Sequence, residues 1–388
     1  MAPANSMHDV AIVGAYNTPQ ARVLPDKSSL DVTVDAIRGA LADAGLQAAD
    51  INGVNANVGL GAQFTAFHIN YLLGGNPSWM GTQRPGVPAV LEAASAIGAG
   101  MCDTVVLAAG QTGTYAERAK TAPWTRPANE FVECWGLYTA AEFALIARRH
   151  MYEYGTTPEQ LAEVAATIRN HGHTNPEAVY HGRGPFTRDD ILNSRMIADP
   201  YHLLDCAMTS EGGAALILTT VERAKELPGP HAYILGGAME RMGPSYVMAP
   251  VWEKYGYVGR RSARTAFAMA GLTPQDVDVC EFYDPFSFEL IRQFEAFEFC
   301  GEGEGGPFVM DGRIHLDGQF PLVTNGGTMS FSHPGVAQML QKVISGADQI
   351  RGRMGPVQVP DVGVAMCTNG GAAALFMEVL LLGREAAA

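Results

Sequence analysis

The chain has 388 residues and a net charge of −14, with 47% hydrophobic and 17% charged residues. This composition supplies enough apolar side chains for a large core and predicts a globular protein. Lysine and arginine form no stripe or block, so the sequence does not favour nucleic acid as a partner. No apolar run approaches the ~20 residues that a membrane-spanning helix needs, and we expect no membrane span.

Six cysteines are scattered along the chain without CxxC pairs, and the first residues have no secretory signal pattern. We therefore expect reduced thiols and a cytoplasmic location. No histidine and cysteine cluster has the spacing of a metal site, and no GxGxxG motif follows the first strand. The expectation is a protein with no metal and no bound cofactor.

The first elements are typical of an α/β protein. Residues 9–14 form a short apolar run that predicts a strand. Residues 30–44 carry apolar side chains at helical spacing, and Gly45 follows as a C-terminal cap.

Two segments of the first half recur, with changes, in the second half. Residues 40–54 resemble 266–279, and residues 86–91 resemble 335–340. The second pair begins two apolar helices, each of which leads to a predicted buried strand, at 104–109 and 362–366. Matches in the same chain order favour a duplicated half-domain over chance similarity.

The duplication predicts two halves, residues 1–228 and 229–388, joined at the turn-rich stretch 227–230. Near-continuous apolar strands favour mostly parallel sheets. Residues 112–195 form a long insertion in the first half, and such insertions commonly cover a site.

Four segments lie at predicted strand ends or helix starts, where α/β proteins place their ligand crevice: 83–90, 281–287, 325–335 and 366–372. In the first, Gln83 precedes a helix N-terminus that suits an anion or an oxyanion. In the second, Tyr283 can donate to a carbonyl oxygen or act as a base. The alternative is a tyrosine that caps the core beside a solvated Asp284.

The last two segments contain a histidine and a cysteine next to glycines. His333 follows a glycine pair and precedes a proline, so its loop is conformationally restricted. Cys367 ends a buried strand and meets Gly370 and Gly371, whose N–H groups could point at a ligand. A small buried apolar residue is the alternative interpretation of Cys367.

In order and approximate spacing, these segments resemble the GHP and CxGG signatures of thiolases, here Ser332-His-Pro-Gly and Cys367-Thr-Asn-Gly-Gly. Residues 203–215 and 299–304 are similar to the sterol-carrier-protein type of thiolase. Tyr283-Asp-Pro-Phe stands where that type has His-Asp-Cys-Phe. The resemblance covers nearly the whole chain.

The resemblance implies a five-layer αβαβα fold of two pseudo-symmetric halves, a homodimer and an acyl-CoA ligand, with coenzyme A as part of the substrate. It implies that His333 helps to form an oxyanion hole and activates a nucleophile, and that Cys367 is an acid or base. Gln83, Asp284, Gly370 and Gly371 are then candidate substrate-binding residues.

The departures from the family pattern change the expected reaction. Gln83-Arg-Pro-Gly86 occupies the place of the nucleophilic Cys-x-Ser-Gly, and a glutamine amide cannot form an acyl-enzyme. Cys102 is the nearest cysteine, but we expect it at the opposite end of the helix. Tyr283 and Pro285 replace the histidine and cysteine of the second motif.

Loss of the nucleophile together with a tyrosine resembles the thiolase-like aldolases of steroid side-chain degradation. These enzymes cleave a β-hydroxyacyl-CoA by a retro-aldol reaction and work with a small OB-fold, zinc-ribbon partner subunit. The resemblance implies that Tyr283 and His333 divide the base and donor tasks while Cys367 protonates the enolate carbon. Tyr138 and Phe331 are nearby in the motifs, but neither is assigned as a second catalytic tyrosine.

Three hypotheses follow. The first is a thiolase-fold lyase that acts at the carbon β to a CoA thioester, with a steroid-like or other bulky acyl chain. The second is an acyltransferase with a different nucleophile. The third is a non-catalytic subunit that binds acyl-CoA.

Overall fold

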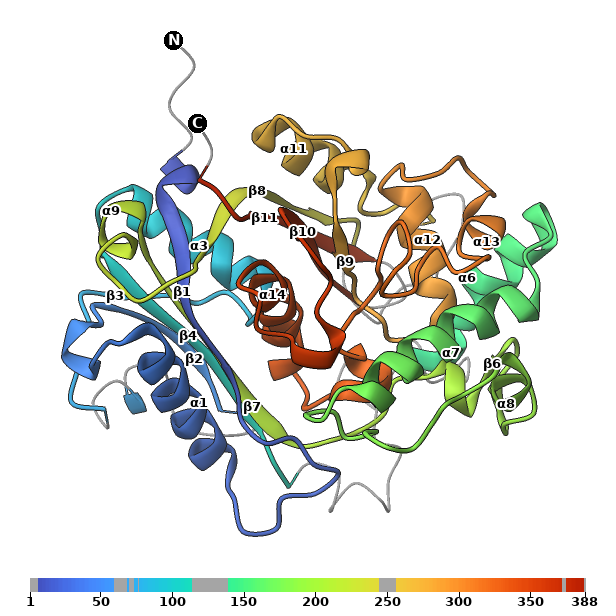
Figure 1. Cartoon of the computed structure of the whole chain (residues 1–388), viewed down its shortest axis with the longest axis horizontal. Coiled ribbons are helices and arrows are strands. Elements are labelled where there is room, and N and C mark those ends of the chain that lie inside the picture. Colours follow the sequence, from blue (N-terminus) through green and yellow to red (C-terminus); the bar gives the residue numbers. More distant parts are fainter. Residues whose placement is uncertain are drawn as a thin grey trace.

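The computed structural model describes residues 6–58, 68–69, 73–75, 77–113, 139–243, 256–371 and 375–386. Its described part contains a nine-stranded sheet in the order β3-β2-β4-β7-β1-β8-β11-β10-β9 (Figure 1). The strands are β1 Val10–Asn17, β2 Gly53–Asn57, β3 Trp79–Met80, β4 Thr104–Gln111, β7 Gly212–Thr220, β8 Ala232–Arg241, β9 Val279–Glu281, β10 Val364–Gly371 and β11 Phe376–Gly383. A separate hairpin-like pair joins β5 Met196–Ala198 to β6 Tyr201–His202.

Helices cover this sheet from outside and also fill the space between its two halves. They are α1 Ser29–Ala44, α3 Val87–Gly98, α6 Thr139–Tyr154, α7 Pro158–Thr174, α8 Arg188–Leu192, α9 Val221–Ala224, α11 Arg260–Ala270, α12 Ser287–Ala296, α13 Gly305–Phe308 and α14 Ala337–Ile350. A single π-helical turn, η6 Gly327–Phe331, precedes α14.

Strand pairing occurs twice in the same pattern. In the first half β2 and β4 are parallel, while β4 with β7 and β7 with β1 are antiparallel. In the second half β9 and β10 are parallel, while β10 with β11 and β11 with β8 are antiparallel. The two halves meet where β1 pairs with β8 over two residue pairs.

The prediction of mostly parallel sheets is therefore wrong, whereas the α/β class is confirmed. Five of the eight strand pairings in the large sheet are antiparallel. The central strands β7 and β11 are antiparallel to both of their neighbours, yet helices bury both of their faces. Such strands have the same continuous apolar pattern as parallel ones.

Helices α3 and α14 lie between the two halves of the sheet and contact strands of both, whereas α1 and α11 each cover one half from outside (Figure 1). Their position buries nearly every face of the helix, so that α14 also buries polar residues such as Gln338, Gln341 and Ser345. Thirteen of the 14 residues of α14 are buried, and one of them is Lys342. A charged side chain in this layer needs a partner there.

Several helices and strands lie where the local sequence pattern predicts them. Helix α1 begins with a Ser28 capping box and ends at Gly45, whose φ of 68° is the left-handed conformation that glycine adopts readily. The expected strands at 9–14 and 104–109 correspond to β1 and β4, while the one at 362–366 begins two residues later, as β10.

The insertion at 112–195 contains α6, α7 and α8, and its residues 114–138 lie outside the described ranges. No helix within the described ranges combines the length and the hydropathy that a membrane crossing requires. Nor do three His, Cys, Asp or Glu side chains of the described part gather as they would around a metal ion. The domain boundary at 228/229 stays a prediction.

Candidate active site

The predicted residues come from four elements that meet around the central helix layer. Tyr283 and Asp284 follow β9, His333 lies between η6 and α14, and Cys367 lies on β10, which pairs with β9. Gln83 precedes α3, which contacts α14. Strand ends and helix starts thus converge here, as in other α/β ligand sites.

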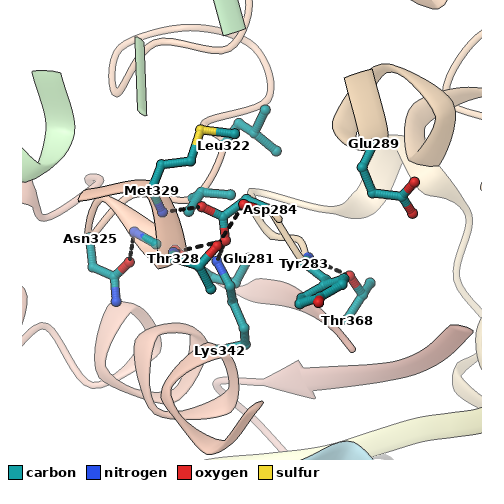
Figure 2. Close-up of polar contacts among 12 residues, drawn as sticks. Glu281, Tyr283, Asp284, Glu289, Leu322, Asn325, Thr328, Met329, Lys342 and Thr368 are labelled. Atoms are coloured by element: carbon teal, nitrogen blue, oxygen red, sulfur yellow. Dashed lines mark hydrogen bonds and ion pairs between the residues drawn. The ribbon is translucent and has the colours of Figure 1, made fainter. Parts of the chain in front are cut away.

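A closed set of hydrogen bonds holds the backbone of Tyr283. Its N–H donates to Thr368 Oγ1 at 2.9 Å (Figure 2). Its carbonyl accepts from Gln293 Nε2 at 2.7 Å. The Thr368 hydroxyl in turn donates to Gln293 Oε1 at 2.7 Å. All three residues are buried, so each of these groups would be costly to leave unpaired.

The Tyr283 ring lies against the glycines of β10. A Cβ on Gly370 would be 3.1 Å from Tyr283 Cδ1, so a side chain there would crowd the ring. Gly370 and Gly371 pair in register with Met377 and Phe376 of β11. The structure thus gives Gly370 a steric reason to be glycine, and ligand binding by these two residues stays a prediction.

Asp284 is fully buried and its carboxylate contacts η6 rather than solvent. Oδ1 accepts from the N–H of Thr328 at 3.0 Å, and Oδ2 accepts from the N–H of Met329 at 3.1 Å (Figure 2). Lys342 Nζ lies 2.5 Å from Oδ1. Gly327 has a φ of 54°, and a Cβ there would overlap the Asp284 carboxylate.

The interpretation of Asp284 as a solvated residue is therefore wrong. The Asp284 side chain is 0% exposed, and both of its carboxylate oxygens accept hydrogen bonds from backbone N–H groups of η6. These contacts make Asp284 a positioning residue for the turn that leads to His333. They do not favour the prediction that it binds substrate.

Two residues of the segment before β7 orient His333. Its N–H donates to Ser210 Oγ at 2.6 Å, and its Nδ1 lies 2.9 Å from the carbonyl oxygen of Met208. Because a carbonyl only accepts, Nδ1 carries the proton in the neutral ring and Nε2 carries the lone pair. Burial lowers the pKa of His333 below its usual 6.5, with Asp284 opposing and Lys342 adding to this effect.

This geometry makes the neutral imidazole a base. Nε2 can accept a proton from a hydroxyl group, whereas it can donate to an oxyanion only after it has been protonated. Of the two roles that the family resemblance implies for His333, the acceptor role fits the tautomer that Met208 selects.

Cys367 lies in the core between β10 and α14. Its side chain is 0% exposed and packs against Gly346, where a Cβ would overlap Sγ. Burial, together with the nearby Glu281, raises the pKa of the thiol well above its usual range. Side chains alternate along a strand, so Thr368, not Cys367, lies beside Tyr283. The proposed proton transfer from Cys367 finds no support in this placement.

The N-terminus of α3 already has a partner within the protein. Asn369 Oδ1 accepts from the N–H of Val87 at 2.7 Å, and a Cβ on Gly86 would overlap that oxygen. Gln83 is exposed, and it lines a cavity of about 470 Å³ with Arg84 and others. No thiol or hydroxyl stands among residues 83–86.

Three further residues were considered in the sequence as possible catalytic groups. Cys102 follows the C-terminal end of α3 as expected, is 3% exposed, and has a pKa raised by burial to about 11. Phe331 is buried in η6. Tyr138 lies outside the described residues.

Sequence reasoning missed most of the residues that support this site. Thr368 and Asn369 stand inside the quoted CxGG-like segment, where the motif itself could have drawn attention to them. Met208 stands inside the family-like segment 203–215, although no role was predicted for it. Lys342 and Gln293 belong to no motif, and only the fold brings them to the site.

Comparisons with known proteins agree with this architecture. The family described as "Thiolase C-terminal domain-like" matches residues 256–384. The steroid side-chain-cleaving aldolase of Thermomonospora curvata is 32% identical over 78% of this chain and 81% of its own length. The acetyl-CoA acetyltransferase of Methanothermobacter thermautotrophicus is 32% identical over 96% of this chain and 99% of its own.

The chain belongs to the thiolase superfamily. It is similar to the sterol-carrier-protein type of that superfamily: sterol carrier protein 2 of Oryctolagus cuniculus is 32% identical over 61% of this chain and 44% of its own length. The solved structure of an "Ltp2-ChsH2(DUF35) aldolase" superposes with a TM-score of 0.83, at 29% identity, covering 97% of this chain and 98% of that one. This thiolase-superfamily member is a thiolase-like acyl-CoA enzyme.

Proposed function

We propose that this thiolase-superfamily member is a lyase that cleaves a β-hydroxyacyl-CoA by a retro-aldol reaction. A bulky, steroid-like acyl chain is the proposed substrate class, because relatives named for steroid side-chain cleavage are about one-third identical to it. Coenzyme A enters as part of the substrate, and the proposal includes no bound cofactor.

In the proposed reaction, His333 Nε2 accepts the proton of the β-hydroxyl group. The electrons of that O–H bond form the new carbonyl, the bond between the α and β carbons breaks, and its electron pair passes to the thioester as an enolate. The Tyr283 hydroxyl donates to the enolate oxygen and stabilises the developing charge. The imidazolium of His333 then returns a proton to the α carbon, so protons balance without Cys367.

The observation that carries this proposal is the N-terminus of α3. Thiolysis needs a nucleophile that forms an acyl-enzyme, and an oxyanion site at the same place. Here residues 83–86 offer no such side chain, and Asn369 already accepts from the N–H of Val87. Retro-aldol cleavage needs neither group, and the base that it does need matches the tautomer of His333.

The proposal extends to partners. One aldolase of similar structure is named as an Ltp2-ChsH2(DUF35) assembly, which supports a DUF35-type, OB-fold subunit as a partner of this chain. A homodimer is proposed on the family resemblance, and a cytoplasmic location on the six cysteines without CxxC pairs.

A mass-spectrometric assay tests the reaction. The protein, alone and with a co-purified partner, is incubated with β-hydroxyacyl-CoA esters and, separately, with β-ketoacyl-CoA esters plus free CoA. We expect cleavage of the hydroxy esters only, with equal amounts of carbonyl product and shortened acyl-CoA and no acyl adduct on the intact protein. Tyr283→Phe and His333→Asn should each lower kcat at least a hundredfold.

An acyltransferase is the second candidate, favoured by the 32% identity to the acetyl-CoA acetyltransferase over 96% of this chain. Thiolysis of the keto esters with an acyl adduct on the protein would establish it and reject the lyase. Acyl-CoA binding without turnover of either panel, in the presence of the partner, would instead favour the non-catalytic subunit.

A further inference from the structure

Lys342 is a buried cation in the helix layer between the two halves of the sheet. Its side chain is 2% exposed, and Nζ lies 2.5 Å from Asp284 Oδ1. The Glu281 carboxyl is also fully buried nearby, at the end of β9 (Figure 2). One ammonium group therefore faces two acidic side chains.

The second acid, Glu281, is held in a different way. Its Oε1 accepts from the N–H of Thr324 at 3.1 Å and from the Thr324 hydroxyl. Its Oε2 has no hydrogen-bond partner among the residues that the structure describes. Burial raises the pKa of Glu281, while the charge of Lys342 lowers it. Asp284, by contrast, holds the direct ion pair with Lys342.

Stability alone does not explain this arrangement. Burying an ammonium and a carboxylate costs desolvation energy, and apolar replacements of buried ion pairs are often neutral or stabilising. Both oxygens of Asp284, however, accept from N–H groups of η6, and hydrogen bonds to a charged acceptor are stronger than those to a neutral one. The Lys342 ammonium lies against the same carboxylate, on Oδ1.

We infer that Lys342 is a positioning residue, whose ammonium group pairs with the Asp284 carboxylate and so holds it where it binds η6 and the loop to His333. The chain of contacts runs from Lys342 to Asp284, and from Asp284 to the N–H groups of Thr328 and Met329. Ser332 and His333 follow directly. The catalytic consequence rests on the proposed function, but the ordering of η6 does not.

Other charged groups reach η6 from a different side. Arg169 of α7 donates from Nη1 to the Met329 carbonyl at 3.0 Å, while its Nε and Nη2 bind carbonyls of Leu204 and Cys206. Arg169 therefore binds the carbonyl side of the turn and Asp284 the N–H side. Loss of Lys342 should loosen only the N–H side.

Hydrogen exchange tests the inference without reference to activity. In Lys342→Met, which keeps the length of the side chain and removes the charge, the amides of Thr328 and Met329 should exchange at least tenfold faster than in the wild type. Gln338→Met is the matched control, since Gln338 is another buried polar residue of α14 and, within the described part of the chain, forms no hydrogen bond or ion pair with Asp284. It should leave both amides unchanged.

Activity supplies the second measurement. Lys342→Met should lower kcat at least tenfold with KM within about twofold, and Lys342→Arg should restore part of the loss. If the wild type cleaves no β-hydroxyacyl-CoA, the proposed function fails while the exchange result still decides the inference. Unchanged exchange at Thr328 and Met329 in folded Lys342→Met would overturn it. If that variant does not fold, Asp284→Asn takes its place with the same expectation and the same refuting result.

Discussion

Replacing Thr368 by valine tests whether the hydrogen bonds behind Tyr283 hold the candidate catalytic residue in place. Valine has nearly the shape of threonine, so the change removes the hydroxyl without leaving a large cavity. Two buried groups lose their partner, the N–H of Tyr283 and Oε1 of Gln293. Each unpaired buried group costs roughly 1–3 kcal/mol, so the free energy of unfolding should fall by about 2–6 kcal/mol.

The same variant should also lose activity, because the backbone that carries the Tyr283 phenol is no longer fixed. A displacement on the order of 1 Å can cost about a hundredfold in rate, and we expect kcat to fall between about tenfold and a hundredfold. Thr368→Ser is the control, since it keeps the hydroxyl and removes one methyl group. Its free energy of unfolding should fall by only about 1 kcal/mol.

Urea denaturation and cleavage of a β-hydroxyacyl-CoA measure the two effects. The reasoning is refuted if Thr368→Val and Thr368→Ser unfold with the same free energy, within about 0.5 kcal/mol. Equal stability would mean that the buried N–H of Tyr283 finds another partner at no cost.

Three further changes probe separate features. Cys367→Ala should keep kcat within about twofold of the wild type, and iodoacetamide at pH 8 should leave the Cys367 thiol of the folded protein unmodified. Rapid labelling of that thiol, or a large loss of rate in the variant, would restore Cys367 as a catalytic group. Burial lowers the pKa of His171 to about 4. The free energy of unfolding should therefore keep its full value above pH 6.5 and fall by up to about 3 kcal/mol as the pH drops towards 4. In urea titrations, His171→Asn should flatten that part of the pH profile. Gly86→Ala should lower the melting temperature by several degrees, because φ is 107° there and a Cβ would overlap the Asn369 side chain; an unchanged melting temperature would show that Asn369 moves away freely.

The sequence predicted the elements whose signals are local. Helix α1 follows from apolar spacing over 30–44 and from Gly45, which lie in one short stretch, and the structure adds a Ser28 cap that was not predicted. Strand direction is not a local property. Residues 212–220 are buried on both faces, and an apolar run of this kind does not distinguish a parallel strand from the antiparallel β7.

The candidate site was predictable by position but not by side-chain direction. Tyr283 and His333 lie at the ends of elements, as their motifs indicate. Cys367 was identified by the same motif, yet it faces the core because alternate residues of β10 face opposite ways. The partners of Asp284 come from η6 and α14, more than 40 residues away, and no local pattern connects them.

Overall similarity does not decide between lyase and acyltransferase. This chain is 32% identical to an aldolase and 32% identical to an acetyltransferase, so the common fold and its core explain both identity values. The reaction depends instead on whether a nucleophile can stand at the N-terminus of α3 with a free N–H beside it. Residues 83–86 carry no thiol or hydroxyl, and the Val87 N–H is bound to Asn369. An acyl-enzyme would need both a nucleophile and a free donor there, whereas a base at His333 matches the tautomer that Met208 selects, and for this reason the lyase is the stronger proposal.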